Sequence, residues 1–149
     1  FVVVAPDIGS VKMARAYAQR LGAGLALVDK RRPKADEIEV MNIIGDVADQ
    51  NVVIFDDIIS TGSTLVKAAA AIRKRGAKKI FAAVTHAVFA PDTSARIEDS
   101  ALEELVVTDT IHHPAAELSG KITVLSVGML LGEAIRRIHE EESLSSLFI

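Results

Sequence analysis

The sequence contains no cysteine and no tryptophan, and only one tyrosine. Without cysteine the chain has no disulfide, no thiolate nucleophile and no cysteine-based zinc site. No apolar run approaches the roughly 20 residues of a transmembrane helix. No basic segment precedes an apolar stretch at the N-terminus, so we expect no signal peptide and a cytoplasmic location. Seventeen basic and 20 acidic residues give a net charge of −3, which argues against binding to nucleic acid or to an anionic membrane.

Half of the 149 residues are hydrophobic and a quarter are charged. This composition can fill one core and excludes intrinsic disorder. The length fits a single domain over residues 1–149. The chain starts with Phe1 rather than Met, and an apolar run typical of a buried strand follows at once. We therefore expect that an upstream segment is missing from this sequence.

Short apolar runs alternate with helical patterns along the chain. We expect strands at residues 2–5, 25–28, 51–55, 80–85, 105–108 and 122–127, and an edge strand at 40–44. Helical spacing predicts helices near residues 14–21, 65–75, 93–102 and 129–140. Asp92 or Thr93 would cap the third helix. Apolar strands separated by helices predict an α/β fold with a mainly parallel sheet and helices on both faces.

Polar clusters follow three of the expected strands, at residues 5–10, 29–33 and 56–64. In an open parallel sheet, ligands bind beyond the carboxyl ends of the strands, so the three clusters should share one edge. The second cluster opens a highly charged stretch over residues 30–39. Such a stretch is typical of an exposed loop rather than of core. A solvated loop without function is therefore the alternative reading of this segment.

The third cluster is the most informative. Asp56 and Asp57 are adjacent at the expected strand end, and Ser60–Thr64 lead into a helix N-terminus. Free N–H groups and the helix dipole favour a phosphate there, and Gly62 would allow close approach. The paired carboxylates would suit ribose hydroxyls, or a magnesium ion through water. Plain helix capping would explain one or two of these residues but not two acids and four hydroxyls.

Residues 55–64, Phe-Asp-Asp-Ile-Ile-Ser-Thr-Gly-Ser-Thr, resemble the phosphoribosyl-diphosphate (PRPP) binding motif of type I phosphoribosyltransferases and ribose-phosphate pyrophosphokinases. Residues 29–33, Asp-Lys-Arg-Arg-Pro, resemble the catalytic flexible loop of the pyrophosphokinases. Residues 5–10 resemble that family's pyrophosphate loop, and residues 106–111 and 137–148 resemble its C-terminal segments. The resemblance thus covers essentially the whole chain and implies the type I phosphoribosyltransferase fold.

The resemblance implies an enzyme that transfers the diphosphoryl group of ATP to the 1-hydroxyl of ribose 5-phosphate. Residues matching the family's 5-phosphate site are Ser60, Thr61, Gly62, Ser63 and Thr64. Asp56 and Asp57 would bind the ribose hydroxyls. Asp7 would bind magnesium, with Gly9 and Ser10 along the pyrophosphate. Lys30 and Arg32 would be catalytic, stabilising the transferred group.

The sequence departs from the family in two respects. The bacterial form often has Asp-Thr-Ala-Gly-Thr where this chain has Ser60–Thr64, so one acid is lost. The family also has an N-terminal half that supplies most of the adenine site and a histidine ligand for magnesium, and nothing here matches it. We therefore expect the isolated domain to be inactive, and the family implies a homo-oligomer, usually a hexamer. The alternatives are a PRPP-using phosphoribosyltransferase and a non-catalytic subunit or fragment.

Overall fold

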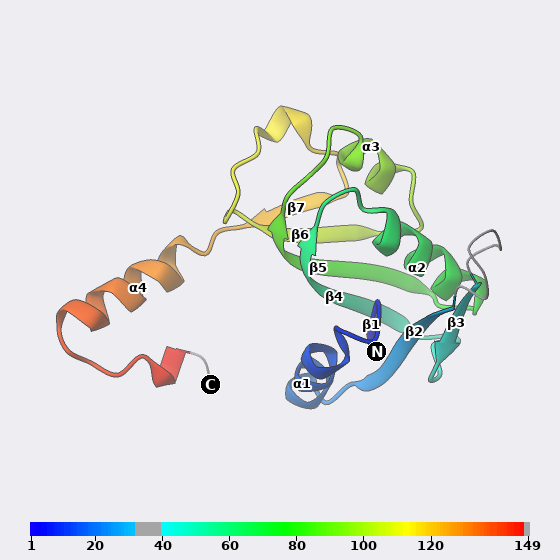
Figure 1. Ribbon diagram of the computed structural model, residues 1–149, viewed down its shortest axis with the longest axis horizontal. Helices are drawn as coiled ribbons and strands as arrows, with labels where there is room; N and C mark the ends of the chain where they lie inside the picture. Colours follow the sequence, from blue (N-terminus) through cyan, green and yellow to red (C-terminus); the bar gives the residue numbers. More distant parts are fainter. Residues whose placement is uncertain (32–39, 148–149) are drawn as a thin grey trace.

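Seven strands form one sheet in the order β3-β2-β1-β4-β5-β6-β7 (Figure 1). The computed structural model describes residues 1–31 and 40–147. The strands are β1 Val2–Ala5, β2 Gly24–Arg31, β3 Val40–Ile44, β4 Asn51–Ile59, β5 Lys79–Ala87, β6 Glu104–Thr108 and β7 Ile122–Leu125. All neighbours pair in parallel except β2 and β3, which are antiparallel. The predicted α/β class and the predicted edge strand at 40–44 are confirmed.

Helices cover both faces of this sheet. The helices of the described residues are α1 Val11–Leu21, α2 Ser63–Lys74, α3 Thr93–Glu98 and α4 Gly128–His139, with short 3-10 turns at Ala115–Glu117 and Ser145–Leu147. The central strand β1 is buried along its whole length. Val2 and Val4 pack in a large core cluster with α2 and α3, whereas Val3 and Ala5 pack in a smaller cluster with α1. Because strand side chains alternate between faces, α1 lies on the face opposite to α2 and α3.

Among the strands that are longer than the sequence predicts, two contain predicted site residues. Strand β4 continues from the expected end at residue 55 to Ile59, so Asp56 and Asp57 lie within it and not after it. Pairing with β5 sustains this extension, since Asp56 is opposite Val84. Strand β2 runs to Arg31, so the backbones of Lys30 and Arg31 belong to a strand and not to the predicted loop. The rest of that loop, 32–39, lies outside the described residues.

Helix α3 is shorter than predicted, ending at Glu98 instead of 102. The Ser100 hydroxyl donates to the Ile97 carbonyl and accepts the N–H of Leu102. These bonds satisfy backbone groups at the helix end and turn the chain towards β6, because side-chain oxygens compete with the helical ladder.

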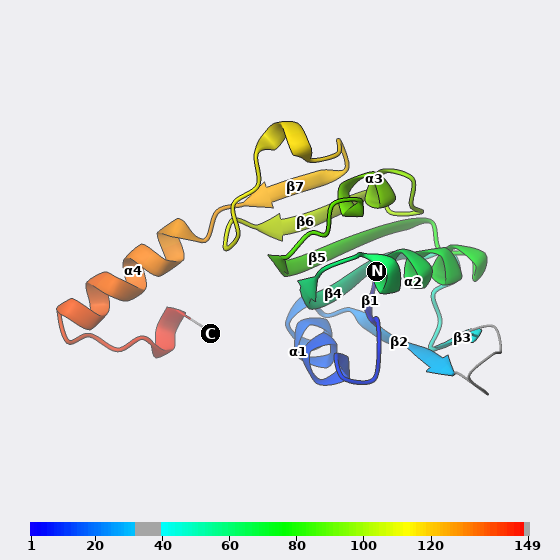
Figure 2. The same cartoon turned by 45° about the horizontal axis from the view of Figure 1, so that its top comes forward.

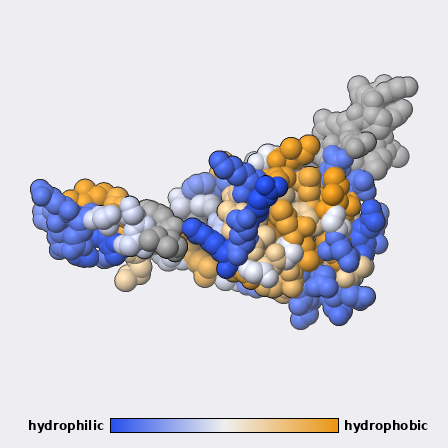
Figure 3. Space-filling view, turned by 90° about the horizontal axis from the view of Figure 1, so that it is seen from below, coloured by the Kyte–Doolittle hydropathy of each residue, from blue (hydrophilic) through white to orange (hydrophobic). Residues whose placement is uncertain are grey.

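Helix α4 extends away from the sheet as an arm (Figures 1 and 2). It forms near the predicted range but buries none of its residues. Met129, Ile135 and Ile138 are 87%, 67% and 63% exposed, and apolar atoms are visible on the arm at the left of Figure 3. Thus α1, α2 and α3 contribute residues to the core on the two faces of the sheet, whereas α4 buries none of its residues. None of the helices in the described ranges is long and apolar enough to cross a membrane.

Candidate substrate-binding site

The order of the strands creates a switch point at the centre of the sheet. The chain leaves β1 through α1 to reach β2 on one side, while β4 occupies the other side of β1. Connections on the two sides diverge here, which opens a crevice at the carboxyl ends of β1 and β4. The loop after β1 carries Asp7, Gly9 and Ser10, and the end of β4 leads into Ser60–Thr64. Two of the three predicted polar clusters therefore meet at this point.

Asp7 organises the loop between β1 and α1. Its Oδ1 accepts hydrogen bonds from the backbone N–H of Ser10 at 2.9 Å and from the Ser10 hydroxyl at 3.0 Å. Ser10 is the residue that precedes α1. A Cβ on Gly9 would stand 3.3 Å from the same Oδ1, so the turn leaves little room for a side chain there. Asp7 thereby closes the loop through one oxygen and keeps the other available to the crevice.

Asp56 and Asp57 reach the site because β4 is longer than β1. The last paired residues of the two strands are Val4 of β1 and Ile54 of β4. Asp56 lies two residues further along β4, beyond the end of this pairing. Adjacent residues of a strand point to opposite faces. In keeping with this, Asp56 is partly buried and Asp57 is exposed. The Oδ1 atom of Asp56 accepts the backbone N–H of Asp57 at 3.0 Å.

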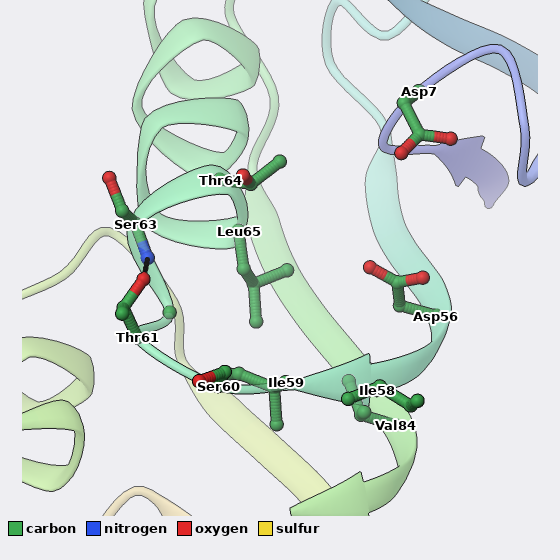
Figure 4. Close-up of a pocket in the computed structure, with 11 residues that line it drawn as sticks. Asp7, Asp56, Ile58, Ile59, Ser60, Thr61, Ser63, Thr64, Leu65 and Val84 are labelled. Atoms are coloured by element: carbon green, nitrogen blue, oxygen red, sulfur yellow. Dashed lines mark hydrogen bonds between the residues drawn. The ribbon is translucent and has the colours of Figure 1, made fainter. Parts of the chain in front are cut away.

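Two open pockets adjoin these carboxylates. The first, of about 210 Å³, is shown in Figure 4 and is lined by Asp7, Asp56, Ile58, Ile59, Ser60, Thr61, Gly62, Ser63, Thr64, Leu65 and Val84. The second, of about 390 Å³, is lined by Asp7, Gly9, Ser10, Met13, Asp56 and Asp57. Asp7 and Asp56 belong to both pockets, so they mark the place where the pockets adjoin.

Residues 60–64, here called the phosphate loop, form the first pocket's wall at the start of α2. Gly62 precedes the helix with φ of 70°, and no side chain caps α2. The backbone N–H of Ser63 donates to Thr61 Oγ1 at 3.4 Å (Figure 4). The hydroxyls of Ser60, Ser63 and Thr64 make no hydrogen bond with another described residue. Capping therefore does not explain these hydroxyls, which leaves them available to a ligand.

Burial and neighbouring carboxylates both disfavour the charged form of Asp56. Burial, followed by the nearby negative charges of Asp57 and Asp7, raises the pKa of Asp56 to about 6, although the N–H of Asp57 opposes the shift. A carboxyl with this pKa is half protonated near pH 6 and mostly ionised at pH 7. A bound cation or a set of hydroxyl donors would relieve the repulsion, so the site favours a ligand that supplies one of them.

Most of the predicted site residues are brought together by the structure. Those that line the two pockets are Asp7, Gly9, Ser10, Asp56, Asp57 and Ser60–Thr64. Lys30 lies in β2 opposite Met41, but its side chain is outside the described part of the structure. Arg32 lies outside the described residues altogether. The roles of the two predicted catalytic residues thus remain predictions.

Sequence analysis missed two residues that contact the phosphate loop from α3. Thr93, expected at most to cap its own helix, donates its hydroxyl to the Ser60 carbonyl at 2.7 Å. Arg96 donates to the Thr61 carbonyl. Their spacing of three residues places them on one helix face, but nothing in the sequence indicates that this face meets residues 60–62. The α3 contacts depend on chain segments that are more than 30 residues apart.

Comparison with known proteins connects this geometry to a family. The family model for the phosphoribosyl synthetase-associated domain matches residues 30–149. The ribose-phosphate pyrophosphokinase of Vibrio parahaemolyticus is 52% identical over 149 residues, which are 99% of this chain and 48% of the relative. That of Ralstonia nicotianae is 53% identical over 148 residues, covering 99% of this chain and 47% of the relative. The chain thus spans about half the length of these curated relatives.

Solved structures agree with the fold. The crystal structure of phosphoribosylpyrophosphate synthetase from Mycobacterium smegmatis matches with a TM-score of 0.86 and 33% identity, over 94% of this chain and 45% of that chain. Orotate phosphoribosyltransferase from Aeropyrum pernix matches with a TM-score of 0.54 at 19% identity, over 91% of this chain and 64% of that chain, which is a likeness of fold alone. The predicted resemblance is confirmed: the chain belongs to the ribose-phosphate pyrophosphokinase family.

Proposed function

We propose that this chain carries the ribose 5-phosphate site and the catalytic loop of a ribose-phosphate diphosphokinase. The enzyme would transfer the diphosphoryl group of ATP to the 1-hydroxyl of ribose 5-phosphate and release AMP. The observation that supports this most is the pairing of a helix N-terminus with carboxylates in one pocket, formed by the phosphate loop, Asp56 and Asp7. A phosphate needs N–H donors and a sugar needs acceptors, and the pocket offers both.

The phosphate loop would bind the 5-phosphate. The helix dipole and unpaired N–H groups at the start of α2 attract an anion. Hydroxyls of Ser60, Ser63 and Thr64 would add donors. The carboxylates of Asp56 and Asp57 would then accept hydrogen bonds from the ribose 2- and 3-hydroxyls. This orientation directs the 1-hydroxyl towards the second pocket, beside Asp7, Gly9 and Ser10.

The second pocket would receive the diphosphoryl group. In the reaction the 1-hydroxyl oxygen forms a bond to the β-phosphorus, the bond from that phosphorus to the AMP oxygen breaks, and the hydroxyl proton is lost. Asp7 and Asp56 offer the hard oxygen ligands that suit magnesium. No group of three or more potential ligands gathers among the described residues. Asp7 would therefore share a magnesium ion with the substrate, and the ion would neutralise phosphate charge.

Lys30 and Arg32 would act from the segment after β2. Diphosphoryl transfer spreads negative charge over non-bridging oxygens, and cations positioned there stabilise the transition state. The chain spans about half of its relatives' length, so we propose that ATP binding and turnover require a further domain. By itself the 149-residue chain would bind the sugar phosphate without producing PRPP. The complete enzyme would be a cytoplasmic homo-oligomer.

Isothermal titration calorimetry tests the proposal. The 149-residue chain is titrated with ribose 5-phosphate and magnesium, and then with ATP and magnesium. We expect ribose 5-phosphate to bind and Asp57→Asn to weaken it, because an amide accepts less strongly than a carboxylate. Asp46→Asn is the matched control, since Asp46 is exposed and accepts the Ala48 N–H away from the site. Absence of binding, or equal affinities of the Asp57→Asn variant and the wild type, would contradict the sugar assignment.

A further inference from the structure

Thr93 is buried and uses its hydroxyl outside its own helix. Its side chain is fully inaccessible to solvent, and it is the one buried polar residue recorded within the described part of the chain. A threonine at a helix start usually bonds the N–H groups of that helix, yet α3 has no side-chain cap bond. Instead, Thr93 Oγ1 donates to the Ser60 carbonyl at 2.7 Å, and the Ala90 N–H donates to the same oxygen at 3.3 Å.

Arg96 continues this contact one turn further along α3. Its guanidinium donates to the carbonyl of Thr61. Gly62 completes the interface, because a Cβ at this position would stand 3.3 Å from Thr93 Cγ2. Three consecutive residues of the phosphate loop are therefore in contact with α3, the first two of them through their carbonyl oxygens. Figures 1 and 2 show α3 beside the chain that leads into α2.

The geometry of the peptide bond determines where the N–H groups of the phosphate loop point when its carbonyls are bound to α3. In a planar trans peptide, the carbonyl of one residue and the N–H of the next point in opposite directions. Bonding the Ser60 and Thr61 carbonyls to α3 therefore directs the N–H groups of Thr61 and Gly62 away from α3. The phosphate loop lines the first pocket, whereas Thr93 and Arg96 do not. Both N–H groups therefore point away from α3, and the residues that carry them line the first pocket.

We propose that Thr93 and Arg96 are positioning residues that hold two consecutive N–H groups of the phosphate loop towards the bound phosphate. This inference rests on the proposed function, because it assigns the same pocket to a phosphate. Neither residue would touch the ligand. Their contribution is preorganisation: the donors are oriented before binding, so the ligand does not have to order them.

Three variants and a control test the proposal. Thr93→Val keeps the shape of the side chain but removes the donor, Thr93→Ser keeps the donor, and Arg96→Met removes the second donor. Ser100→Ala is the matched control, because Ser100 also bonds a carbonyl of α3, that of Ile97, without contacting the phosphate loop. Inorganic phosphate and ribose 5-phosphate are titrated separately, with the Thr61 and Gly62 amide resonances followed by NMR and global stability measured in urea.

We expect phosphate to shift both amide resonances in the wild type. Thr93→Val should weaken phosphate binding by about three- to tenfold, as expected for loss of one hydrogen bond, and Arg96→Met by a similar factor. Thr93→Ser and Ser100→Ala should bind within about twofold of the wild type. The rescue by serine and the unaffected control would separate orientation of the loop from a general loss of stability in α3.

The outcomes also distinguish this inference from the proposed function. If phosphate shifts the two amide resonances and Thr93→Val weakens it, but ribose 5-phosphate does not bind, the positioning role stands and the sugar assignment fails. If ribose 5-phosphate binds the wild type and Thr93→Val equally, the positioning role is wrong although the function stands. It is also wrong if Ser100→Ala weakens binding as much as Thr93→Val, or if phosphate leaves both wild-type amide resonances unchanged.

Discussion

Asp7 and Asp56 line the same two pockets at the carboxyl ends of β1 and β4, although 48 residues separate them in the chain, at positions 8 to 55. Their negative charges interact, which contributes to the raised pKa of Asp56. A folded protein retains such repulsion when the groups serve a ligand, since function and stability are often opposed at a binding site. The protonation of Asp56 should therefore affect both the stability and the affinity of the site.

Asp56→Asn should stabilise the protein above pH 6. The folded-state pKa of Asp56 is raised to about 6, so between about pH 4 and pH 6 the folded state binds more protons than the unfolded state. Wild-type stability therefore falls as pH rises through this window, and the advantage of the asparagine variant grows and then becomes constant. We expect Asp56→Asn to be about 1 kcal/mol more stable than the wild type at pH 8. This is less than the full pKa shift of Asp56 implies, because water screens a half-buried carboxylate.

Urea unfolding at pH 4, 6 and 8 measures this difference. Asparagine retains the oxygen that accepts the Asp57 N–H, so the variant loses charge with little change in hydrogen bonding. Asp46→Asn is again the control, because it also accepts a backbone N–H but lies outside the carboxylate cluster. A stability difference for Asp56→Asn that does not grow between pH 4 and pH 6 would show that folding does not raise the pKa of Asp56.

The affinity for ribose 5-phosphate with magnesium should decrease below pH 6. The proposed site needs Asp56 as a carboxylate, and a pKa of about 6 makes protons compete with the ligand. Simple competition predicts binding at pH 5 about tenfold weaker than at pH 7. The phosphate of the ligand titrates in the same range, so calorimetry on Asp56→Asn gives the reference. Equal pH dependence of the wild type and the variant would exclude Asp56 as the titrating group.

The site follows from sequence where its residues are close in the chain or placed by the general rules of parallel sheets. Alternating strands and helices give the fold class, and the switch-point rule brings the segments around Asp7 and Asp56 together. The length of β4 could not be foreseen, because acidic residues are disfavoured in strands. Pairing with β5 overrides that preference. The sequence pattern therefore placed Asp56 at the correct edge of the sheet but outside the strand to which it belongs.

Contacts between distant segments were harder to predict. Thr93 has the residue type of a helix cap, and only the packing of α3 against the phosphate loop shows that its hydroxyl bonds Ser60. The position of α4 was missed for a similar reason. Its spacing predicts an amphipathic helix, but periodicity does not identify what the apolar face packs against. The helix itself was therefore predicted correctly, but the sequence did not indicate where it lies relative to the sheet.

Arg73→Lys should destabilise the fold by about 1–2 kcal/mol, because several net hydrogen bonds are lost. The Arg73 guanidinium donates to the carbonyls of Ala77, Lys78 and Ala101 and pairs with Glu103 at 3.0 Å. It thus joins the end of α2 to the starts of β5 and β6. A lysine ammonium lacks the planar fork that reaches these acceptors together.

Glu103→Gln is the matched variant for Arg73. It removes the charge of the ion pair while leaving the three carbonyl bonds in place. Exposed ion pairs contribute little, so we expect a loss below about 1 kcal/mol. Urea unfolding of both variants separates the two contributions. If Glu103→Gln costs as much as Arg73→Lys, the ion pair and not the carbonyl network holds these elements.

Gly62→Ala should reduce both stability and phosphate affinity, and the comparison with Gly22→Ala should show why. Both glycines have positive φ, 70° and 60°, so alanine costs roughly 1–2 kcal/mol at each from backbone strain. A Cβ on Gly22 meets no atom within 4 Å, whereas one on Gly62 meets Thr93 Cγ2 at 3.3 Å. Only the change at Gly62 should therefore push the phosphate loop away from α3.

Unfolding in urea and titration with inorganic phosphate measure the two effects. We expect Gly22→Ala to lose stability and keep its affinity, and Gly62→Ala to lose stability and bind phosphate at least about threefold more weakly, the equivalent of one disturbed hydrogen bond. Because strain is matched, any excess effect at Gly62 comes from the contact between α3 and the loop. Equal phosphate affinities of the two variants would mean that the loop tolerates displacement, and that its position relative to α3 does not control binding.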